Sequence, residues 1–293
     1  MWVLFSILTV LLWGTSDVIF KSVSDKGTVN DLQLLGLNGT VYGVSCLIYW
    51  AIIGEQFTLE SLIKYLPIAA LYIASMLFYY KMLPHIKISI ASPIANSSCV
   101  LTTILCIVVL GQTVTALQAT AILLIVSAII ILSLDREPRQ EKGLKTKDYL
   151  FGIGCAMIYF AFDGVASFLD DYMLDETLSE SDVIIAYGVC YLIVGVIALT
   201  VAAAKAGREG KKLDYSFVKS PKTIAGCLIE TGGQFTYVYA YAAGDAAIAS
   251  PFIAAFAMVS VILSRIFLKE KLNLKQYILV FMMLAGMFIL AIE

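Results

Sequence analysis

The chain is built from long apolar stretches that are almost free of charge. Of its 293 residues, 60% are hydrophobic and 14% are charged, against about 25% charged in an average soluble protein. A bilayer core of about 30 Å needs roughly 20 apolar residues per helix, and backbone polar groups in lipid must bond to one another. These stretches therefore predict an all-α polytopic membrane bundle. Ten spans fit this length: about 2–23, 31–53, 62–83, 87–110, 114–134, 148–169, 183–205, 219–242, 245–268 and 273–292.

The distribution of basic residues predicts how the bundle is oriented. Nineteen of the 20 Lys and Arg residues lie in or beside the odd-numbered connections between spans, and only Lys64 lies elsewhere. The 170–182 connection is instead acidic and includes Asp170 and Asp171. Basic connections stay in the cytoplasm. We therefore expect a multi-pass protein of the cell (inner) membrane, with cytoplasmic odd-numbered connections and both termini on the extracytoplasmic side.

An internal repeat divides the chain into two halves. A shift of 158 residues places Ser92-Pro93 on Ser250-Pro251, and a shift of 146 places Asp17 on Asp163. These matches predict two five-helix repeats, residues 1–135 and 148–293, joined by a basic cytoplasmic linker over 136–147. Because five is an odd number, the second repeat must be inverted relative to the first. Inverted repeats place a solute site near the membrane midplane, where the halves meet.

Several short motifs resemble a known family. They are Trp13-Gly14, the two Ser-Pro pairs and the turn Leu268-Lys269-Glu270-Lys271-Leu272, which has Lys269 where the family has Gly. The first-half counterpart of this turn begins with Gly111 and lacks the Glu. The chain thus resembles the drug/metabolite transporter (DMT) superfamily, in particular its EamA branch of ten-helix transporters. The resemblance implies a central cavity between the repeats and secondary transport by alternating access.

Three acidic residues fall inside predicted spans. Asp17, Asp163 and Glu230 have no basic residue at comparable depth, because Lys21 is expected to reach the cytoplasmic surface. An acid in a membrane span is costly and usually faces a polar cavity or a partner. The three carboxylates could bind an organic cation, or take up a proton and couple transport to it. The alternatives are a purely structural role and, for Asp17, an ion pair with Lys21 one turn away.

Aromatic and amide side chains share helix faces with these acids. Aromatic faces with a carboxylate are how proteins hold ammonium groups, and tyrosine is frequent, at 16 residues. The alternative is an interfacial belt, since Tyr79, Tyr80, Tyr239 and Tyr241 fall near predicted helix ends. The predicted ligands, besides the acids, are Trp13, Tyr159, Gln234, Tyr237, Tyr72 and Tyr79.

Two prolines and a polar cluster mark the fourth and ninth spans. Pro93 and Pro251 each remove a backbone hydrogen bond about two turns into a span, so they could act as paired points of flexure or be merely tolerated. Asn96, in the polar cluster after Pro93, is a further predicted ligand. Gly39 and Gly43 form a small-xxx-small face for close helix packing.

The sequence gives little support for other classes of function. One histidine, His85, and six scattered cysteines predict neither a metal site nor a disulfide framework, and no phosphate-binding loop or catalytic set is present. We expect no cofactor, no nucleic-acid partner and no enzymatic activity; a monomer is compatible with the sequence. The leading hypothesis is a secondary transporter for a small amine-bearing or cationic metabolite, with proton coupling as an option. An amino-acid or drug exporter of the same fold, and a membrane-embedded lipid carrier or enzyme, remain alternatives.

Overall fold

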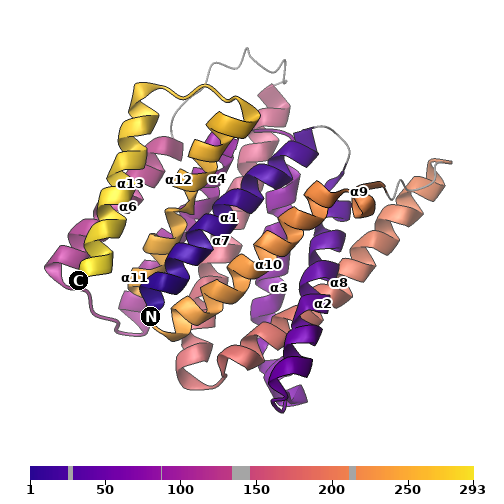
Figure 1. Ribbon diagram of the computed structural model, residues 1–293, viewed down its shortest axis with the longest axis horizontal. Helices are drawn as coiled ribbons and strands as arrows, with labels where there is room; N and C mark the ends of the chain where they lie inside the picture. Colours follow the sequence, from indigo (N-terminus) through magenta and orange to yellow (C-terminus); the bar gives the residue numbers. More distant parts are fainter. Residues whose placement is uncertain (26–28, 87, 134–145, 211–215) are drawn as a thin grey trace.

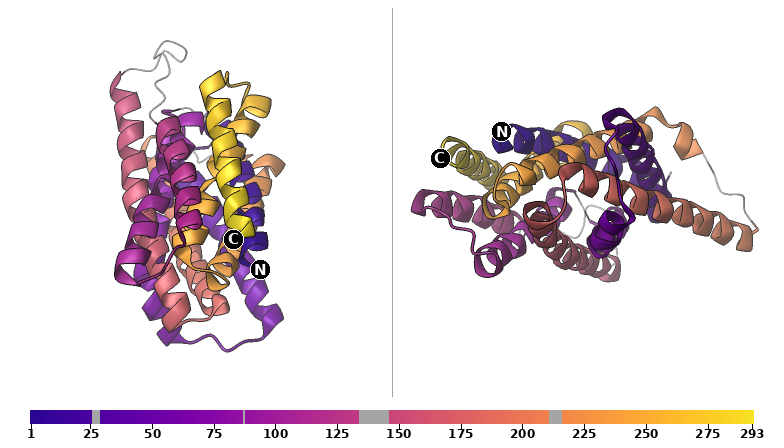
Figure 2. Two further views of the ribbon diagram at one scale, coloured as in Figure 1. Left: turned by 90° about the vertical axis from the view of Figure 1, so that its left-hand side faces the viewer. Right: turned by 90° about the horizontal axis from the view of Figure 1, so that it is seen from below.

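The fold is a bundle of helices, seen here in a computed structural model that describes residues 1–25, 29–86, 88–133, 146–210 and 216–293. No strand occurs in these residues. The helices run broadly along one direction, as the side and end views in Figure 2 show. They are α1 (Trp2–Asp25), α2 (Asp31–Ile53), α3 (Leu59–Met82), α4 (Ile88–Asn96), α5 (Ser98–Val109), α6 (Ala116–Ser133), α7 (Thr146–Glu176), α8 (Glu180–Arg208), α9 (Ser216–Lys219), α10 (Pro221–Ala242), α11 (Ala246–Ala254), α12 (Phe256–Leu263), the π-helix η1 (Ser264–Leu268) and α13 (Leu274–Ile292).

The predicted membrane bundle is confirmed. Every predicted span coincides with a helix or with consecutive short helices, and α9 is an additional short helix between two spans. Eight helical stretches are long and apolar enough to cross a membrane, and α6 is a shorter apolar helix. The more polar α10 is not among the eight, although its 22 residues would reach across a bilayer.

Local sequence signals set the helix boundaries. Asn30 caps α2 and Asn273 caps α13, each with a Gln three residues later that bonds back to the cap. Such reciprocal capping satisfies backbone N–H groups that have no partner inside the helix. Gly54 ends α2 in the left-handed conformation, at φ 68°, which glycine adopts without steric cost.

The fourth and ninth spans are both broken, at equivalent positions. The first break lies at Ser97, between α4 and α5, and the second at Ala255, between α11 and α12. Each follows its proline by four residues, and the two breaks are 158 residues apart. A proline removes one backbone hydrogen bond and loosens the adjacent turn. The predicted prolines therefore lie inside helices that are interrupted in the same way.

Helix packing relates the two halves of the chain. In the first half α1 packs on α10 and α12, and in the second half α7 packs on α3 and α5. The α2–α8 and α6–α13 pairs join the halves directly; Figure 1 shows α6 beside α13. In the α2–α8 seam, Gly39 faces the backbone of Tyr191 and Gly43 that of Gly188, where added Cβ atoms would lie 2.5 and 2.9 Å from the carbonyl oxygens. The predicted small-xxx-small face is therefore a close helix contact.

Three expectations about individual residues are wrong. Asp170 and Asp171 do not lie in a connection, because α7 continues to Glu176 and buries both side chains. Lys21 does not reach the surface: it is fully buried, pairs with Asp25 at 2.9 Å and donates to the carbonyls of Leu83 and Ile86.

The tyrosines expected in an interfacial belt are mostly inside the bundle. Tyr79, Tyr80 and Tyr241 are buried, and Tyr239 is half-buried and shares a hydrogen bond of 2.7 Å with Tyr49. A tyrosine near a helix end can thus point towards neighbouring helices, as Tyr79 does towards Tyr159, and not towards the lipid interface.

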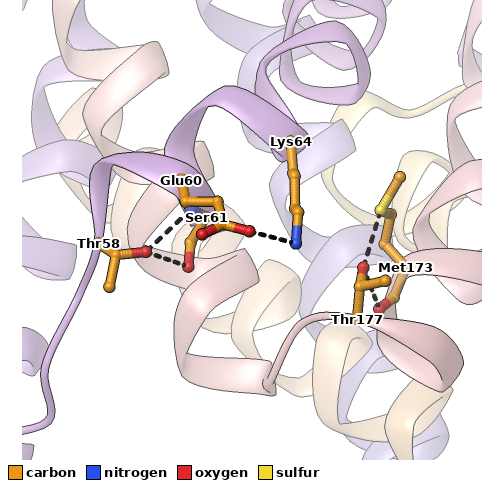
Figure 3. Close-up of polar contacts among 6 residues, drawn as sticks. All are labelled: Thr58, Glu60, Ser61, Lys64, Met173 and Thr177. Atoms are coloured by element: carbon orange, nitrogen blue, oxygen red, sulfur yellow. Dashed lines mark hydrogen bonds and ion pairs between the residues drawn. The ribbon is translucent and has the colours of Figure 1, made fainter.

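Both termini lie at the same end of the bundle (Figure 1). The start of α3 and the end of α7 meet at this end, where Thr58 caps α3 and the exposed pair Glu60–Lys64 closes at 2.8 Å (Figure 3). We call this the terminal end. We call the opposite end the basic end, because the odd-numbered connections, with 19 of the 20 basic residues in or beside them, belong to it. Most of the predicted 136–147 linker lies outside the described residues.

Candidate functional site

A central pocket lies where the two halves meet. Its space, counted with the part that opens to solvent, is about 620 Å³. Three acids, from α1, α7 and α10, face it, and the described residues that line it include no Lys, Arg or His. The lining residues are Trp13, Asp17, Phe20, Asn38, Tyr42, Tyr72, Ser75, Met76, Tyr79, Tyr159, Asp163, Tyr187, Tyr191, Glu230, Gln234 and Phe256.

Asp17 is held by three hydroxyl groups from three other helices. Tyr79 of α3 donates to one carboxylate oxygen, while Ser92 of α4 and Ser260 of α12 donate to the other at 2.8 and 2.6 Å. The expected alternative, a pair with Lys21, is not formed: Lys21 pairs with Asp25 instead. Hydroxyl donors stabilise a carboxylate without neutralising its charge. Asp17 thus joins α1, α3, α4 and α12 through one side chain.

Glu230 and Asp163 are less enclosed than Asp17. Both are half-buried. Glu230 of α10 accepts a hydrogen bond from Ser16 of α1, the residue directly before Asp17. Asp163 of α7 accepts one from Ser98 of α5 at 2.6 Å and also interacts with Tyr159, one turn earlier. Since one donor leaves much of a carboxylate's capacity unused, these two acids are the better placed to contact a bound solute.

Aromatic rings complete the pocket wall. Trp13 packs against Tyr237 and Phe256, with ring centroids 5.2 and 5.6 Å apart, and Tyr79 packs against Tyr159 at 5.5 Å. The Trp13 ring reaches this place because Gly233 of α10 lies against it; an added Cβ would be 2.4 Å from the indole. Carboxylates between aromatic faces make a site suited to an ammonium group.

Three buried polar atoms of the pocket have no hydrogen-bond partner among the described residues. They are the indole Nε1 of Trp13, the amide oxygen of Asn38 and the hydroxyl oxygen of Tyr42. The Asn38 amide nitrogen, by contrast, donates to Tyr80 and Tyr191 at 2.9 and 3.2 Å. A buried polar group without a partner costs free energy. The Trp13 donor, the Asn38 acceptor and the Tyr42 hydroxyl, which can act as either, are therefore available for a ligand or water.

A second pocket adjoins the central one. It shares Trp13, Tyr72, Tyr159, Asp163 and Phe256 with the central pocket. Its own lining includes the remaining predicted ligands and several small polar groups: Asn96, Ser98, Cys99, Ser167, Tyr237, Tyr241 and Ser250. Asn96 donates to Ser92 at 3.0 Å, so this amide supports a residue that itself holds Asp17.

All ten predicted ligand residues line one of the two pockets. Sequence reasoning placed Ser92 and Ser98 in the polar cluster of the fourth span without predicting that they donate to the acids, and it missed Ser16, Ser260 and Asn38. A serine in an apolar span gives no distinct signal when no residue three or four positions away marks it as a hydrogen-bond donor. Asn38 offered one, since an amide inside an apolar span is unusual.

Two close helix contacts have a register that can be compared with the predicted repeat. Gly14 of α1 lies against Val259 and the Phe256 carbonyl, and Gly164 of α7 against Leu101 and the Ser98 carbonyl. Those partners are 158 residues apart, whereas the two glycines are 150 apart. In this register Asp17 corresponds to Ser167 and Asp163 to Trp13. The register of these contacts differs by four residues, about one helical turn, from the predicted pairing of Asp17 with Asp163; the repeat itself stays a prediction.

The described residues contain no group of three or more His, Cys, Asp and Glu side chains arranged to hold a metal ion. The six cysteines are buried as free thiols. His85 packs edge-on against Phe151 in the α3–α4 connection, away from both pockets.

Comparisons with known proteins agree with this architecture. The family model described as "EamA-like transporter family" matches residues 1–134 and 150–292. Chains of solved structures that match number 29. One of them, titled "Crystal structure of protein", has a TM-score of 0.71 and 15% sequence identity, over 99% of this chain and 96% of its own. No curated protein gives a significant match.

Proposed function

From the premise that this chain belongs to the EamA-like transporter family, we propose that it is a secondary active transporter for a small amine-bearing or cationic organic metabolite. Membership makes it a membrane transporter of small molecules. The single observation that carries the substrate class is the lining of the central pocket, where three carboxylates stand among aromatic rings with no basic residue in the described lining.

Charge balance favours a cation over an anion or a neutral solute. An anion would meet Asp17, Asp163 and Glu230 in a pocket between packed helices, where repulsion between like charges is stronger than in bulk water. A primary or quaternary ammonium group would offset that charge and contact ring faces. A ligand carrying a donor and an acceptor would also satisfy the Asn38 oxygen and the Trp13 nitrogen.

The two halves supply a route to alternating access. Related packing of α1 and α7, and breaks at the same register in the fourth and ninth spans, are what an inverted repeat produces. Rocking of one half against the other would expose the pocket to each side in turn. A carboxylate released by the leaving cation could take up a proton, so proton exchange is the proposed coupling.

The basic end is proposed to face the cytoplasm, because 19 of the 20 basic residues lie in or beside connections on that side. The chain would then sit in the cell (inner) membrane with both termini outside. A C-terminal reporter that is active only in the cytosol would report the opposite orientation.

The test is uptake into proteoliposomes of a panel of amines (choline, polyamines, basic and aromatic amino acids), with and without a pH gradient. We expect Glu230→Gln to abolish uptake while the protein still inserts, because the amide keeps the shape of the side chain and removes its charge. Glu60→Gln is the matched control, since Glu60 is exposed and pairs only with Lys64 at the terminal end. Uptake by Glu230→Gln at the wild-type rate, or binding of anions and no amine, would refute the cation site.

A further inference from the structure

α7 carries a second acid that the proposed site does not use. Asp170 is fully buried, at 0% exposure, although it lies only six residues from the end of the helix. Its two oxygens accept hydrogen bonds from two tyrosines of α3, Tyr65 at 2.8 Å and Tyr72 at 3.2 Å. An ionised carboxylate in such a place costs free energy unless it is paired.

This acid is connected to the substrate pockets through hydroxyl groups. The Tyr72 hydroxyl also contacts Ser167 at 3.2 Å and Tyr237 at 2.7 Å, and all three residues line the second pocket. Asp163, Ser167 and Asp170 follow one another at four and three residues, so they share one face of α7. A chain of O–H groups therefore runs from the pocket to Asp170 and on to Tyr65, towards the terminal end.

The groups that face Asp170 are acids and tyrosines. From α3 come Tyr65 and Tyr72, from α8 Tyr187, and from α10 Tyr237. On α7 itself the neighbouring ionisable groups are Asp171 and, two turns earlier, Asp163. None of these carries positive charge, so a proton is the counter-charge that this set of side chains can accommodate.

The same contacts fasten the two halves together. Tyr65 and Tyr72 belong to the first half, whereas Asp170 and Tyr237 belong to the second. Opening the pocket towards the terminal end would pull α3 away from α7 and α10, and it would break the three hydrogen bonds Tyr65–Asp170, Tyr72–Asp170 and Tyr72–Tyr237.

We propose that Asp170 is a proton-binding site, distinct from the cation-binding acids, whose protonation releases the tyrosine clamp at the terminal end. A proton from water at that end adds to the carboxylate, which becomes a neutral acid with one O–H donor. Its oxygens then no longer hold two tyrosine donors tightly, and the Tyr72 hydroxyl can turn its hydrogen to Tyr237 or Ser167. Loss of the proton restores the carboxylate and closes the clamp. This inference rests on the proposed transport function for its role and not for the existence of the proton site.

Infrared spectroscopy of the full-length protein in lipid nanodiscs tests the site directly, because a protonated carboxyl group has its own C=O stretching band. Titration of the wild type with acid should reveal bands that grow as carboxylates are protonated. Asp170→Asn should lose one of them, Asp163→Asn should lose another and keep the Asp170 band, and Tyr65→Phe should shift the Asp170 band by removing its 2.8 Å donor. If Asp170→Asn does not fold, the Tyr65→Phe shift decides; unchanged bands in every variant that folds would overturn the proposal.

Transport measurements separate this inference from the proposed function. If the Asp170 band titrates but no amine is bound or transported, the substrate assignment fails and the proton site stands. If amine uptake is proton-dependent and Asp170→Asn keeps the wild-type pH profile, the clamp fails and the substrate assignment stands. Loss of that pH dependence in Asp170→Asn, with amine binding retained, is the result we expect.

Discussion

The two broken spans are interrupted at the same register but carry different side chains. α4–α5 breaks at Ser97 and supplies hydroxyls to two acids, from Ser92 to Asp17 and from Ser98 to Asp163. In α11–α12 the position equivalent to Ser98 is Phe256, whose ring packs against Trp13. The first broken span thus supplies hydroxyls to two acids, whereas the second supplies one hydroxyl, from Ser260 to Asp17, and the aromatic ring of Phe256. The two spans share the position of the break, and the side chains at equivalent positions determine what each span contacts.

Gly14 and Gly164 occupy similar places against the two broken spans. Each glycine lets its helix pack closely on the broken span of the opposite half, next to the carbonyl oxygen of the residue that follows the break. The approach is closer at Gly14, where an added Cβ would lie 2.5 Å from the Val259 Cβ; at Gly164 the nearest atom is 3.0 Å away.

The largest effect on stability should come from Gly14→Ala, at up to about 3 kcal/mol of unfolding free energy, since overpacking forces helices apart. Gly164→Ala should cost less, because the atoms nearest to its added Cβ lie at 3.0 Å and not at 2.5 Å. Gly154→Ala is the control, as nothing lies within 4 Å of its added Cβ. The measurement is denaturant unfolding in mixed micelles; equal losses in Gly14→Ala and Gly154→Ala would contradict the packing seen here.

A smaller effect distinguishes the two serines that hold Asp17. Ser92→Ala removes a donor to Asp17 and also the acceptor of Asn96, whereas Ser260→Ala removes a donor to Asp17 and no comparable acceptor. We expect costs of about 2 and about 1 kcal/mol respectively, because groups left unpaired inside the protein lose their solvation. Ser45→Ala, on a half-buried serine that bonds only its own helix, is the control. A greater loss for Ser260→Ala in the same unfolding assay would show that Asn96 is not held through Ser92.

The bundle could be predicted from the sequence because lipid leaves few choices. Apolar length determines the spans, and the Asn30 and Asn273 caps mark two helix starts within a residue. The ten predicted ligands line the pockets because a helix face that carries an acid is unfavourable against lipid and therefore packs towards the inside of the bundle.

What sequence reasoning missed depends on contacts between helices. Asp170 looked like part of an acidic connection because hydropathy falls there, yet Tyr65 and Tyr72 provide the donors that let α7 bury it. Lys21 looked like a surface residue, but two carbonyl groups of the α3–α4 connection hold it inside. The identity of a single charged residue does not reveal whether a neighbouring helix provides a hydrogen-bond or ion-pair partner for it.

The smallest change in unfolding free energy is expected for substitutions in the turns that follow the two broken spans. Gly111 and its equivalent, Lys269, both adopt the left-handed conformation, at φ 71° and 57°. A side chain there costs about 1–2 kcal/mol, while glycine gives back part of that through the freedom of the unfolded chain. Lys269→Gly should therefore raise the unfolding free energy by about 0.5 kcal/mol, and Gly111→Ala should lower it by about 1 kcal/mol. Lys271→Gly, in the same turn with ordinary φ, controls for loss of the lysine charge. If Lys269→Gly is destabilising, contacts of the lysine side chain outweigh its backbone strain, and the two turns are equivalent in shape only.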